Sequence, residues 1–519
     1  IAMSDWSSDV CSSDLSFFKR KEIEQNNTGT TIGFYLGSPE AEGENKSEKQ
    51  NLVAFFEDYM DIQNQILDGK FIISGRKGSG KSAFVKYVLD NSGEQQELFS
   101  SLIKPSEFDL EKLIQTLPSN IENKYEILFE WIILTRFVQL ILKSNCATYT
   151  REYKSLEQFY KKNSGVIEID KYVTSEITTN NQAEVNLNPL KGIFSTTLSK
   201  FFSNKLVKAP FFQFIPSLRE IVIQILNFDV YANIDFILLF DDLDIKFKLS
   251  REQDKIKLLD LIRLTKRYNN EYLKKTKGRI LIFLRDDIGK RLDGIDSDKN
   301  KIFGSYEYKI NWYNYESGSM QEKDILLRKF INKRIGINFQ TMNIPYNIID
   351  PWLTLVDNNV HPDYNRKTAF RYILDFTFYR PRDFVNIFKN IGSCNYSIPL
   401  NPNSIKALLK QFVQTNVGEI KDELTVLFDA SSIENIFSLL NQIARTSNLS
   451  YTALLELMDD YNIDRSNFVI LLDYCLIIPK DTMGYQYFNY REQPLLNNYE
   501  DYVYTLPKCL YTYFVPGAI

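Results

Sequence analysis

The sequence predicts an α/β fold in which a parallel β-sheet is followed by a largely helical region. Short, mainly apolar runs, such as Phe71–Ile73, Ile234–Phe240 and Arg279–Leu284, alternate with longer amphipathic stretches. Strands that are apolar on both faces are typical of parallel sheets covered by helices on each side. After Met320 the pattern becomes helical throughout. The sheet is therefore expected in the earlier part of the chain.

The composition is that of a folded protein with several domains. The 519 residues leave room for about three domains. Lys and Arg number 62 and Asp and Glu 66, so the net charge of −4 provides no global basic field for nucleic acid or membrane. The longest apolar stretches, Trp131–Leu142 and Phe468–Pro479, are shorter than the roughly 20 residues that a membrane span requires. We expect a soluble protein without membrane attachment.

Cysteine and histidine usage excludes several kinds of site. The 5 cysteines lie far apart and form no CxxC pair, which argues against a disulfide framework and a thiolate metal site. The chain has a single histidine, which nearly excludes histidine-based metal sites and Ser-His-Asp catalysis. This usage fits a reducing compartment, and we expect a cytoplasmic protein.

The first fifty residues divide into two parts. Residues 1–15 look like the translation of a sequencing-adapter oligonucleotide, and we interpret them as a sequencing or cloning artefact. Residues 16–50 are polar and punctuated by glycine and proline, so we expect an N-terminal linker.

Residues 51–315 carry the elements of the predicted α/β core. The apolar spacing of residues 52–67 is that of an amphipathic helix. A mostly helical insertion at about residues 110–230, with a polar excursion at 174–210, interrupts the core. The remaining predicted elements are strands at 71–73, 100–104, 234–240, 279–284 and 306–312 and helices at 83–89 and 252–275.

Two further units are expected after the core. Residues 316–425 are predicted to form a helical lid. From Ser432 to about Asn489, three short helical segments precede two strand-like pieces, Cys475–Ile478 and Tyr485–Tyr490. That order is typical of a winged-helix module, so residues 426–519 are predicted to be a winged-helix-like C-terminal domain.

The strongest motif is a phosphate loop. Residues 75–82 match the Walker A pattern G-x-x-x-x-G-K-[ST] in full, between an apolar strand and a helix. Glycines are required because backbone N–H groups must turn inward around phosphate oxygens. Lys81 is expected to reach the β- and γ-phosphates of ATP, and the Ser82 hydroxyl to ligate Mg²⁺. The candidate nucleotide-binding residues are Gly75, Arg76, Lys77, Gly78, Ser79, Gly80, Lys81, Ser82 and Ala83.

A Walker-B-type strand supplies the candidate acids. The apolar run ending at Phe240 is followed at once by Asp241 and Asp242. A carboxylate at the tip of a buried strand can hold the Mg²⁺ shell, and a second one can orient the attacking water. We assign Asp241 to the metal and Asp242 to the water. Asp244 is an alternative second acid, and the shorter side chain of Asp, where many ring ATPases have Glu, predicts slow turnover.

Three arginines are candidate sensors of the nucleotide. Arg285 follows the next strand, where a side chain can meet the γ-phosphate; pairing with Asp286 or Asp287 is the alternative. Arg380 and Arg382 flank a proline at an expected helix start. Arginines at a helix start are repelled by the positive end of the helix dipole, and an anion nearby would offset this repulsion. We interpret both as sensor-2 candidates on the lid, against a solvated helix start as the alternative.

Together these motifs resemble AAA+-like ATPases of the wider STAND and KAP group. The resemblance rests on Gly75–Ser82, Phe240–Asp244, Phe283–Arg285 and Arg380–Asp383. With the upstream Pro39–Glu42, the phosphate loop also looks like that of an orphan bacterial P-loop ATPase family often encoded among phage-defence genes.

The resemblance covers about residues 30–390. It implies a P-loop NTPase core with a sheet of order 5-1-4-3-2, an ATP–Mg²⁺ site, a helical lid and a winged helix behind it. KAP members typically carry membrane spans between the Walker motifs; this chain has a polar helical insertion there, so membrane attachment is not implied. Lys301 and Arg334 are the candidates for an arginine finger.

Three functions remain open at this point. The first is a slow or partner-stimulated ATP-hydrolysing switch that acts on a protein partner or a self-oligomer, with a defence role implied only by the resemblance. The second is a loader-like ATPase whose winged helix engages DNA. The third is a scaffold that holds nucleotide with little turnover. A small-molecule kinase is disfavoured because no acceptor site is evident.

Overall fold

The computed structural model describes most of the chain. The described residues are 29–93, 97–108, 110–115, 117–167, 184–191, 208–243, 252–292, 298–313, 321–358, 367–446, 448–491 and 498–518. Residues 1–15 and Asp244, for which the sequence suggested an artefact and an alternative acid, lie outside them.

Among the described residues, five strands form a parallel sheet in the order β4-β7-β8-β3-β9. Numbered along the chain within this sheet, the order reads 5-1-4-3-2 from the β9 edge. The register sets Gly75 opposite both Arg285 and Ile310, so the carboxyl ends of three strands meet at one edge. The strands are β3 (Ile72–Gly75), β4 (Leu98–Ile103), β7 (Asp235–Phe240), β8 (Gly278–Arg285) and β9 (Glu307–Ile310).

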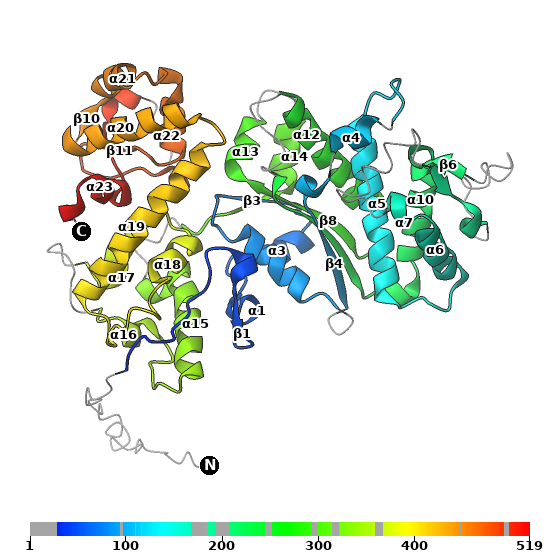
Figure 1. Ribbon diagram of the computed structural model, residues 1–519, viewed down its shortest axis with the longest axis horizontal. Helices are drawn as coiled ribbons and strands as arrows, with labels where there is room; N and C mark the ends of the chain where they lie inside the picture. Colours follow the sequence, from blue (N-terminus) through cyan, green and yellow to red (C-terminus); the bar gives the residue numbers. More distant parts are fainter. Residues whose placement is uncertain are drawn as a thin grey trace, which may run out of the picture.

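Helices cover both faces of the sheet, which explains why its strands are apolar throughout. In Figure 1, α3 lies on one side of the strands and α12, α13 and α14 on the other. Residues at the centre, such as Ile72, Ile73 and Ile282, have no exposed surface. The flanking helices are α1 (Leu52–Phe55), α2 (Ile62–Leu67), α3 (Lys81–Asp90), α12 (Glu252–Arg267), α13 (Asp286–Arg291) and α14 (Lys299–Tyr306).

The insertion after β4 is mainly helical and packs against the edge of the sheet. Helix α5 contacts β4 and β7 on one side and α10 on the other, so Trp131 and Phe137 are fully buried. Its long apolar run therefore serves this packing. The elements are α4 (Leu110–Gln115), α5 (Lys124–Ser144), α6 (Arg151–Lys162), α7 (Ser164–Ile167), β5 (Glu184–Asn186), β6 (Lys208–Pro210) and α10 (Phe211–Leu226).

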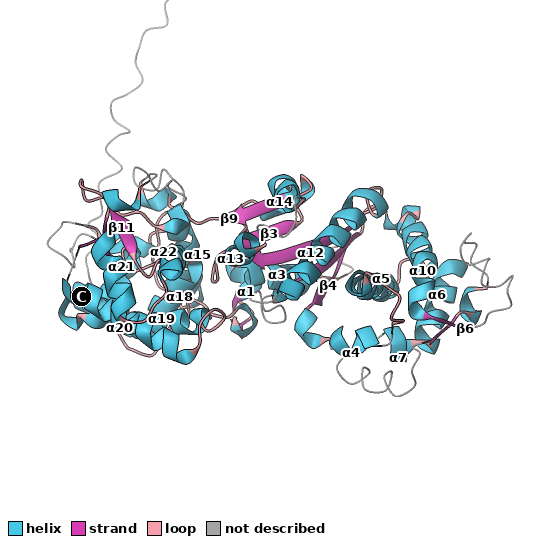
Figure 2. Cartoon of the chain, turned by 90° about the horizontal axis from the view of Figure 1, so that it is seen from above, coloured by secondary structure: helices cyan, strands magenta, loops and turns pink. Residues whose placement is uncertain are grey.

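The helical lid and the C-terminal module follow the core, at the end of the sheet opposite the insertion (Figure 2). Helix α19 joins them, because Leu409 and Phe412 belong to the apolar core of the sheet and lid while Ile420 and Leu424 belong to that of the module. The lid helices are α15 (Leu326–Thr341), α16 (Trp352–Leu355), α17 (Ala369–Leu374), α18 (Pro381–Phe388) and α19 (Pro402–Leu424).

The described part of the C-terminal module combines four helices with a three-stranded antiparallel sheet of order β10-β12-β11. The predicted strand at Tyr485–Tyr490 is wrong: that stretch makes a single bridge, between Lys480 and Gln486, and β12 completes the sheet instead. The elements are α20 (Ala430–Thr446), β10 (Leu449–Ser450), α21 (Tyr451–Asp460), α22 (Phe468–Asp473), β11 (Ile478–Lys480), β12 (Val503–Thr505) and α23 (Lys508–Phe514).

The N-terminal residues 29–50 pack onto the core and lid instead of extending as a linker. Phe34 and Leu36 are buried, and the short strands β1 (Asn45–Ser47) and β2 (Gln50–Asn51) pair with each other. The Asn338 side chain accepts a hydrogen bond from the Tyr35 N–H and donates one to the Tyr35 carbonyl, both at 2.7 Å. Because a lid side chain replaces water around this backbone, a polar composition is compatible with burial.

The predicted helix at residues 52–67 is two short helices, α1 and α2. The Asp58 carboxylate accepts hydrogen bonds from the N–H groups of Ile62 (3.0 Å) and Gln63 (2.8 Å), so it caps a new helix start. Asp61 adopts a left-handed backbone (φ 57°). Phe56 and Tyr59 lie in the break between the two helices, and the Tyr59 ring contacts Trp312, which follows the end of β9.

No helix in the described ranges combines the length and the apolar character needed to cross a membrane.

Candidate nucleotide site

The phosphate-loop motif forms the turn between β3 and α3. Gly78 and Gly80 have positive φ angles of 80° and 101°, a conformation that glycine adopts without a steric penalty. An added Cβ at Gly75 would lie 2.7 Å from the Ser79 hydroxyl, so a side chain at this position would clash with the loop. The first turn of α3 follows this loop and has backbone N–H groups without intrahelical partners, as anion binding requires, whereas the Ser79 N–H donates to the Arg76 carbonyl at 3.1 Å.

Lys81 lies at the start of α3, with its side chain folded over the loop. Its Nζ donates hydrogen bonds to the carbonyl oxygens of Gly75 (2.6 Å) and Arg76 (3.0 Å). The residue is only 8% exposed. An ammonium group held on backbone carbonyls inside the loop can exchange them for phosphate oxygens after a small rotation of its side chain.

The two candidate acids follow β7 at the same edge of the sheet. Asp241 is buried, and burial and then the neighbouring Asp242 raise its pKa, against a smaller lowering by the Ser82 hydroxyl and the charge of Lys81. Asp242 has a left-handed backbone (φ 57°) that turns its side chain away from the strand. Asp241 and Ser82 thus form an oxygen-rich pair of the kind that suits Mg²⁺.

Asp242 is held by an ion pair that the sequence did not reveal. The Lys104 ammonium lies 2.7 Å from its carboxylate and 3.6 Å from that of Glu42. The hydrogen bond to Asp242 is the main cause of the raised pKa of Lys104. Lys104 follows the edge strand β4, and only the register of β4 on β7 brings it beside Asp242.

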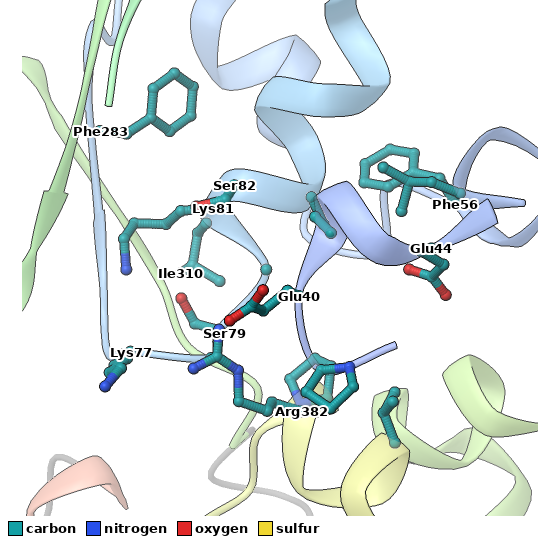
Figure 3. A pocket seen from close by; sticks show the side chains of 18 of the residues that line it. Glu40, Glu44, Phe56, Lys77, Ser79, Lys81, Ser82, Phe283, Ile310 and Arg382 are labelled. Carbon is teal, nitrogen blue, oxygen red and sulfur yellow. The ribbon is translucent and has the colours of Figure 1, made fainter. Parts of the chain in front are cut away.

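These residues line a cavity of about 750 Å³, a size typical of small-molecule sites. Its lining combines the phosphate loop, Asp241 and Asp242 with apolar side chains and with further acidic residues such as Glu44 and Asp58. Figure 3 shows Lys81, Ser79 and Arg382 around the loop and Phe56 on the far wall. The main apolar lining residues are Phe55, Phe56, Met60, Ile310, Trp312 and Phe330.

The cavity contains buried polar atoms that lack a partner in the described part of the chain. Ser79 Oγ and Arg382 Nε make no hydrogen bond there. Buried polar groups are normally satisfied, so unsatisfied ones at a cavity wall indicate a ligand. With the glycine cradle and the Asp241–Ser82 pair, these groups fit a nucleotide with its Mg²⁺.

The N-terminal segment supplies one wall of the cavity, through residues such as Glu40 and Glu44. Arg334 of α15 anchors this wall: its guanidinium pairs with Glu44, donates to the Leu36 carbonyl at 2.9 Å and lies on the ring of Phe330. The prediction of Arg334 as an arginine finger is wrong, because a side chain buried this way cannot reach a neighbouring molecule. Lys301 is exposed on α14, 3.8 Å from Asp298.

The two lid arginines point to different places. Arg382 lies over the phosphate loop: an added Cβ at Gly78 would come within 3.0 Å of the Arg382 Cβ. Arg380 does not line the cavity; its guanidinium is buried and hydrogen-bonded to Asp383 and Asn416. It also donates to the Lys77 carbonyl at 3.3 Å. Arg380 therefore links the lid to the phosphate loop outside the cavity, whereas Arg382 lines the cavity.

Arg285 lines the cavity but is paired with a carboxylate beside it. Its Nε and Nη2 donate to Asp287 at 3.0 and 2.9 Å. The Tyr474 hydroxyl, from the C-terminal module, donates to the same carboxylate at 2.8 Å. Burial alone would raise the pKa of Asp287, but Arg285 and Tyr474 hold it below its ordinary value. A chain of contacts thus joins the cavity to the C-terminal module.

Arg76 of the phosphate loop makes a second link to that module. Its guanidinium lies over the rings of Phe378 (5.6 Å) and Tyr490 (5.3 Å) and donates to the Phe378 carbonyl. Lys77 lies 4.0 Å from Glu423 at the end of α19. Arg76 and Lys77, at two of the variable positions of the loop, therefore contact the lid and the module, and Lys77 also lines the cavity.

Comparison with known proteins assigns no family. No protein-family model matches the chain, and no curated protein matches it. Among solved structures, the chain is similar to Cdc6p from Pyrobaculum aerophilum, at 12% sequence identity over 88% of this chain and 92% of that one. The TM-score is 0.25, too low for the likeness to carry an argument. The structure shows an α/β fold with a phosphate-loop motif at the carboxyl edge of a parallel sheet.

Proposed function

We propose that this chain is an AAA+-like, Mg²⁺-dependent ATPase that works as a molecular switch. The observation that carries the proposal is the convergence of three parts on one cavity: the phosphate loop, the acids that follow β7, and Arg382 from the lid. Each part comes from a different region of the chain, and a ligand with several phosphates is the chemistry they share.

The proposed roles follow from the contacts. The loop N–H groups and Lys81 hold the phosphates, and Lys81 exchanges the Gly75 and Arg76 carbonyls for phosphate oxygens. Ser82 and Asp241 would hold Mg²⁺, which supplies charge neutralisation and orientation of the phosphates. Arg382 would contact the phosphates from the lid side. The apolar side chains of the lining, such as Phe56, suit a purine base, and ATP is preferred to GTP on the motif resemblance.

Asp242 is the proposed group that orients the attacking water. The water oxygen bonds to the γ-phosphorus, the bond from that phosphorus to the bridging oxygen breaks, and ADP and inorganic phosphate result. In the present arrangement the Asp242 carboxylate is engaged by Lys104 at 2.7 Å. Turnover therefore requires Lys104 to move or to share the carboxylate with the water, which supports the expectation of a slow enzyme.

The proposed switch couples the nucleotide to the C-terminal module. Arg285 faces the cavity but is bound to Asp287, which also holds Tyr474 of that module. A γ-phosphate competes with Asp287 for the guanidinium, whereas ADP does not. Binding of ATP in place of ADP would thus weaken the contact between the core and the module, as in other switches that respond to a terminal phosphate.

Two alternatives each have one supporting observation. The order α20-β10-α21-α22-β11-β12 supports a winged-helix module, and hence a DNA-engaging ATPase. The Lys104–Asp242 ion pair supports a nucleotide-holding scaffold. Membership of the STAND or KAP group, a place in phage defence, a protein partner or self-oligomer, and a cytoplasmic location stay predictions from the sequence.

The test is phosphate release by the purified chain with ATP and Mg²⁺, with and without duplex and single-stranded DNA. Lys81→Ala should abolish release, and Asp242→Asn should lower it at least tenfold while nucleotide still binds. Lys86→Ala is the matched control, since Lys86 lies on the same helix but pairs with Asp90 at the surface. Release that survives in Lys81→Ala would refute the site, and strong stimulation by DNA would favour the DNA-engaging alternative.

If nucleotide binds but Asp242→Asn and the unmodified chain release phosphate equally slowly, the scaffold replaces the switch.

A further inference from the structure

A second cavity, of about 450 Å³, lies between the lid and the C-terminal module. Its walls come from the segment around α17 on one side and from residues 486–491 and 505–511 on the other. None of its lining residues lines the nucleotide cavity. The residues that give it chemical character are Lys367, Asp375, Tyr490, Arg491, Lys508 and Tyr511.

The described lining residues of this cavity carry more positive than negative charge. Three cations, Lys367, Arg491 and Lys508, face one carboxylate, Asp375. Lys367 lies 2.6 Å from Asp375, and Lys508 shares the same carboxylate at 3.9 Å. Asp375 is therefore already engaged by two lysines.

Arg491 is half-buried and lies among aromatic rings. Its guanidinium lies 4.5 Å from the ring centre of Phe488, 5.1 Å from Tyr313 and 5.7 Å from Tyr490. Its Nε is buried without a hydrogen-bond partner, and we find no carboxylate paired with it in the described ranges. A desolvated charge is stable in proteins when a counter-charge and hydrogen bonds satisfy it. Within the described ranges the Arg491 Nε lacks such a partner, and an anion that enters the cavity would supply it.

The rest of the lining favours an anion that carries a flat ring. Phe488, Tyr490 and Tyr511 add aromatic surface beside the cations. Planar guanidinium groups bind phosphate and carboxylate in a bidentate manner, and aromatic side chains stack on heterocycles. The volume lies within the range of about 300–1,000 Å³ found for small-molecule sites.

We propose that this cavity is a second ligand site, independent of the phosphate loop, for an anion with a planar ring and the size of a nucleoside monophosphate. Arg491 and Lys508 hold the anionic group, and the aromatic wall holds the ring. Tyr490 lines this cavity, and its ring also contacts Arg76 of the phosphate loop.

The test is a calorimetric titration of the full chain with AMP after the phosphate loop has been saturated with ADP and Mg²⁺. We expect one further binding event, and a Kd for ribose 5-phosphate, which lacks the base, at least tenfold weaker. Arg491→Gln should weaken AMP at least tenfold and change ADP affinity less than threefold. Lys508→Gln should act in the same direction and serves if Arg491→Gln fails to fold. Lys410→Gln, an exposed position on α19, is the matched control and should change neither affinity.

Absence of a second AMP event, equal AMP affinity in the unmodified chain and in both variants, or ribose 5-phosphate binding as tight as AMP would each overturn the proposal. Because ADP binding is measured in the same experiment, a failure of the phosphate-loop site would be recognised separately.

Discussion

Replacing Asp287 with Asn tests whether Arg285 reports the γ-phosphate to the C-terminal module. The amide keeps the shape of the carboxylate, and its oxygen can still accept the hydrogen bond from Tyr474. The substitution removes the negative charge that holds Arg285 through two hydrogen bonds of 3.0 and 2.9 Å. The guanidinium of the variant is therefore freer to turn toward a terminal phosphate.

The expected magnitude follows from this pair of contacts. Hydrogen bonds to charged groups contribute about 1.5–3 kcal/mol. The low end applies here, since the side chains of Arg285 and Asp287 retain 11% and 21% of their exposure and water screens part of the attraction. About 1.4 kcal/mol corresponds to a factor of ten in affinity. The ratio of ATP-analogue affinity to ADP affinity should therefore rise about tenfold in Asp287→Asn.

The assay is calorimetric titration with a non-hydrolysable ATP analogue and with ADP, both with Mg²⁺. Asp473→Asn is the matched control: Asp473 lines the same small cavity as Arg285 and Asp287 and also links the module to the core, but its carboxylate pairs with Lys290, at 2.8 Å. Its affinity ratio should stay unchanged. An Asp287→Asn ratio within about twofold of the unmodified chain would refute the reasoning that a γ-phosphate and Asp287 compete for Arg285.

Three further predictions concern stability and the loop. Because Asp287 has a lowered pKa, its ion pair should stabilise the fold at every pH above the ordinary value of 3.8, and the difference in unfolding free energy between the unmodified chain and Asp287→Asn should disappear only below that pH. Arg334→Met leaves the buried Glu44 unpaired and should cost about 3–5 kcal/mol in urea denaturation, part of which Glu44→Gln restores. Gly78→Ala forces a strained backbone and a contact with Arg382, so nucleotide affinity should fall at least tenfold in the same titration.

Each of these has a control within the chain. Lys329→Met changes an exposed cation on the same helix as Arg334 and should alter stability by less than about 0.5 kcal/mol. Gly418→Ala lies in α19 with open space around its Cβ, and should leave nucleotide affinity unchanged. The argument for Asp287 would be contradicted if the difference in unfolding free energy between the unmodified chain and Asp287→Asn did not change with pH. A loss of less than about 1 kcal/mol in Arg334→Met would contradict the argument for the buried ion pair. An unchanged nucleotide affinity in Gly78→Ala would contradict the argument for the loop.

The sequence by itself determined the elements whose signal is local. Consecutive apolar residues predicted the strands of the sheet to within a few residues, because a strand buried on both faces leaves little room for polar side chains. The phosphate loop between β3 and α3 was evident from its glycines, since backbone angles that only glycine adopts freely leave a trace in the residue type itself. The positions of Asp241 and Asp242 were predicted because both follow directly after such an apolar strand.

Only the tertiary structure decided which distant side chains meet. Arg380 and Arg382 are two residues apart and equivalent in sequence, yet burial turns Arg380 to Asp383 and leaves Arg382 over Gly78. Lys104 reaches Asp242 because β4 and β7 are neighbours in the sheet, although more than a hundred residues separate them. Contacts of this kind depend on the register of strands and the packing of helices, which a linear pattern of residue types does not encode.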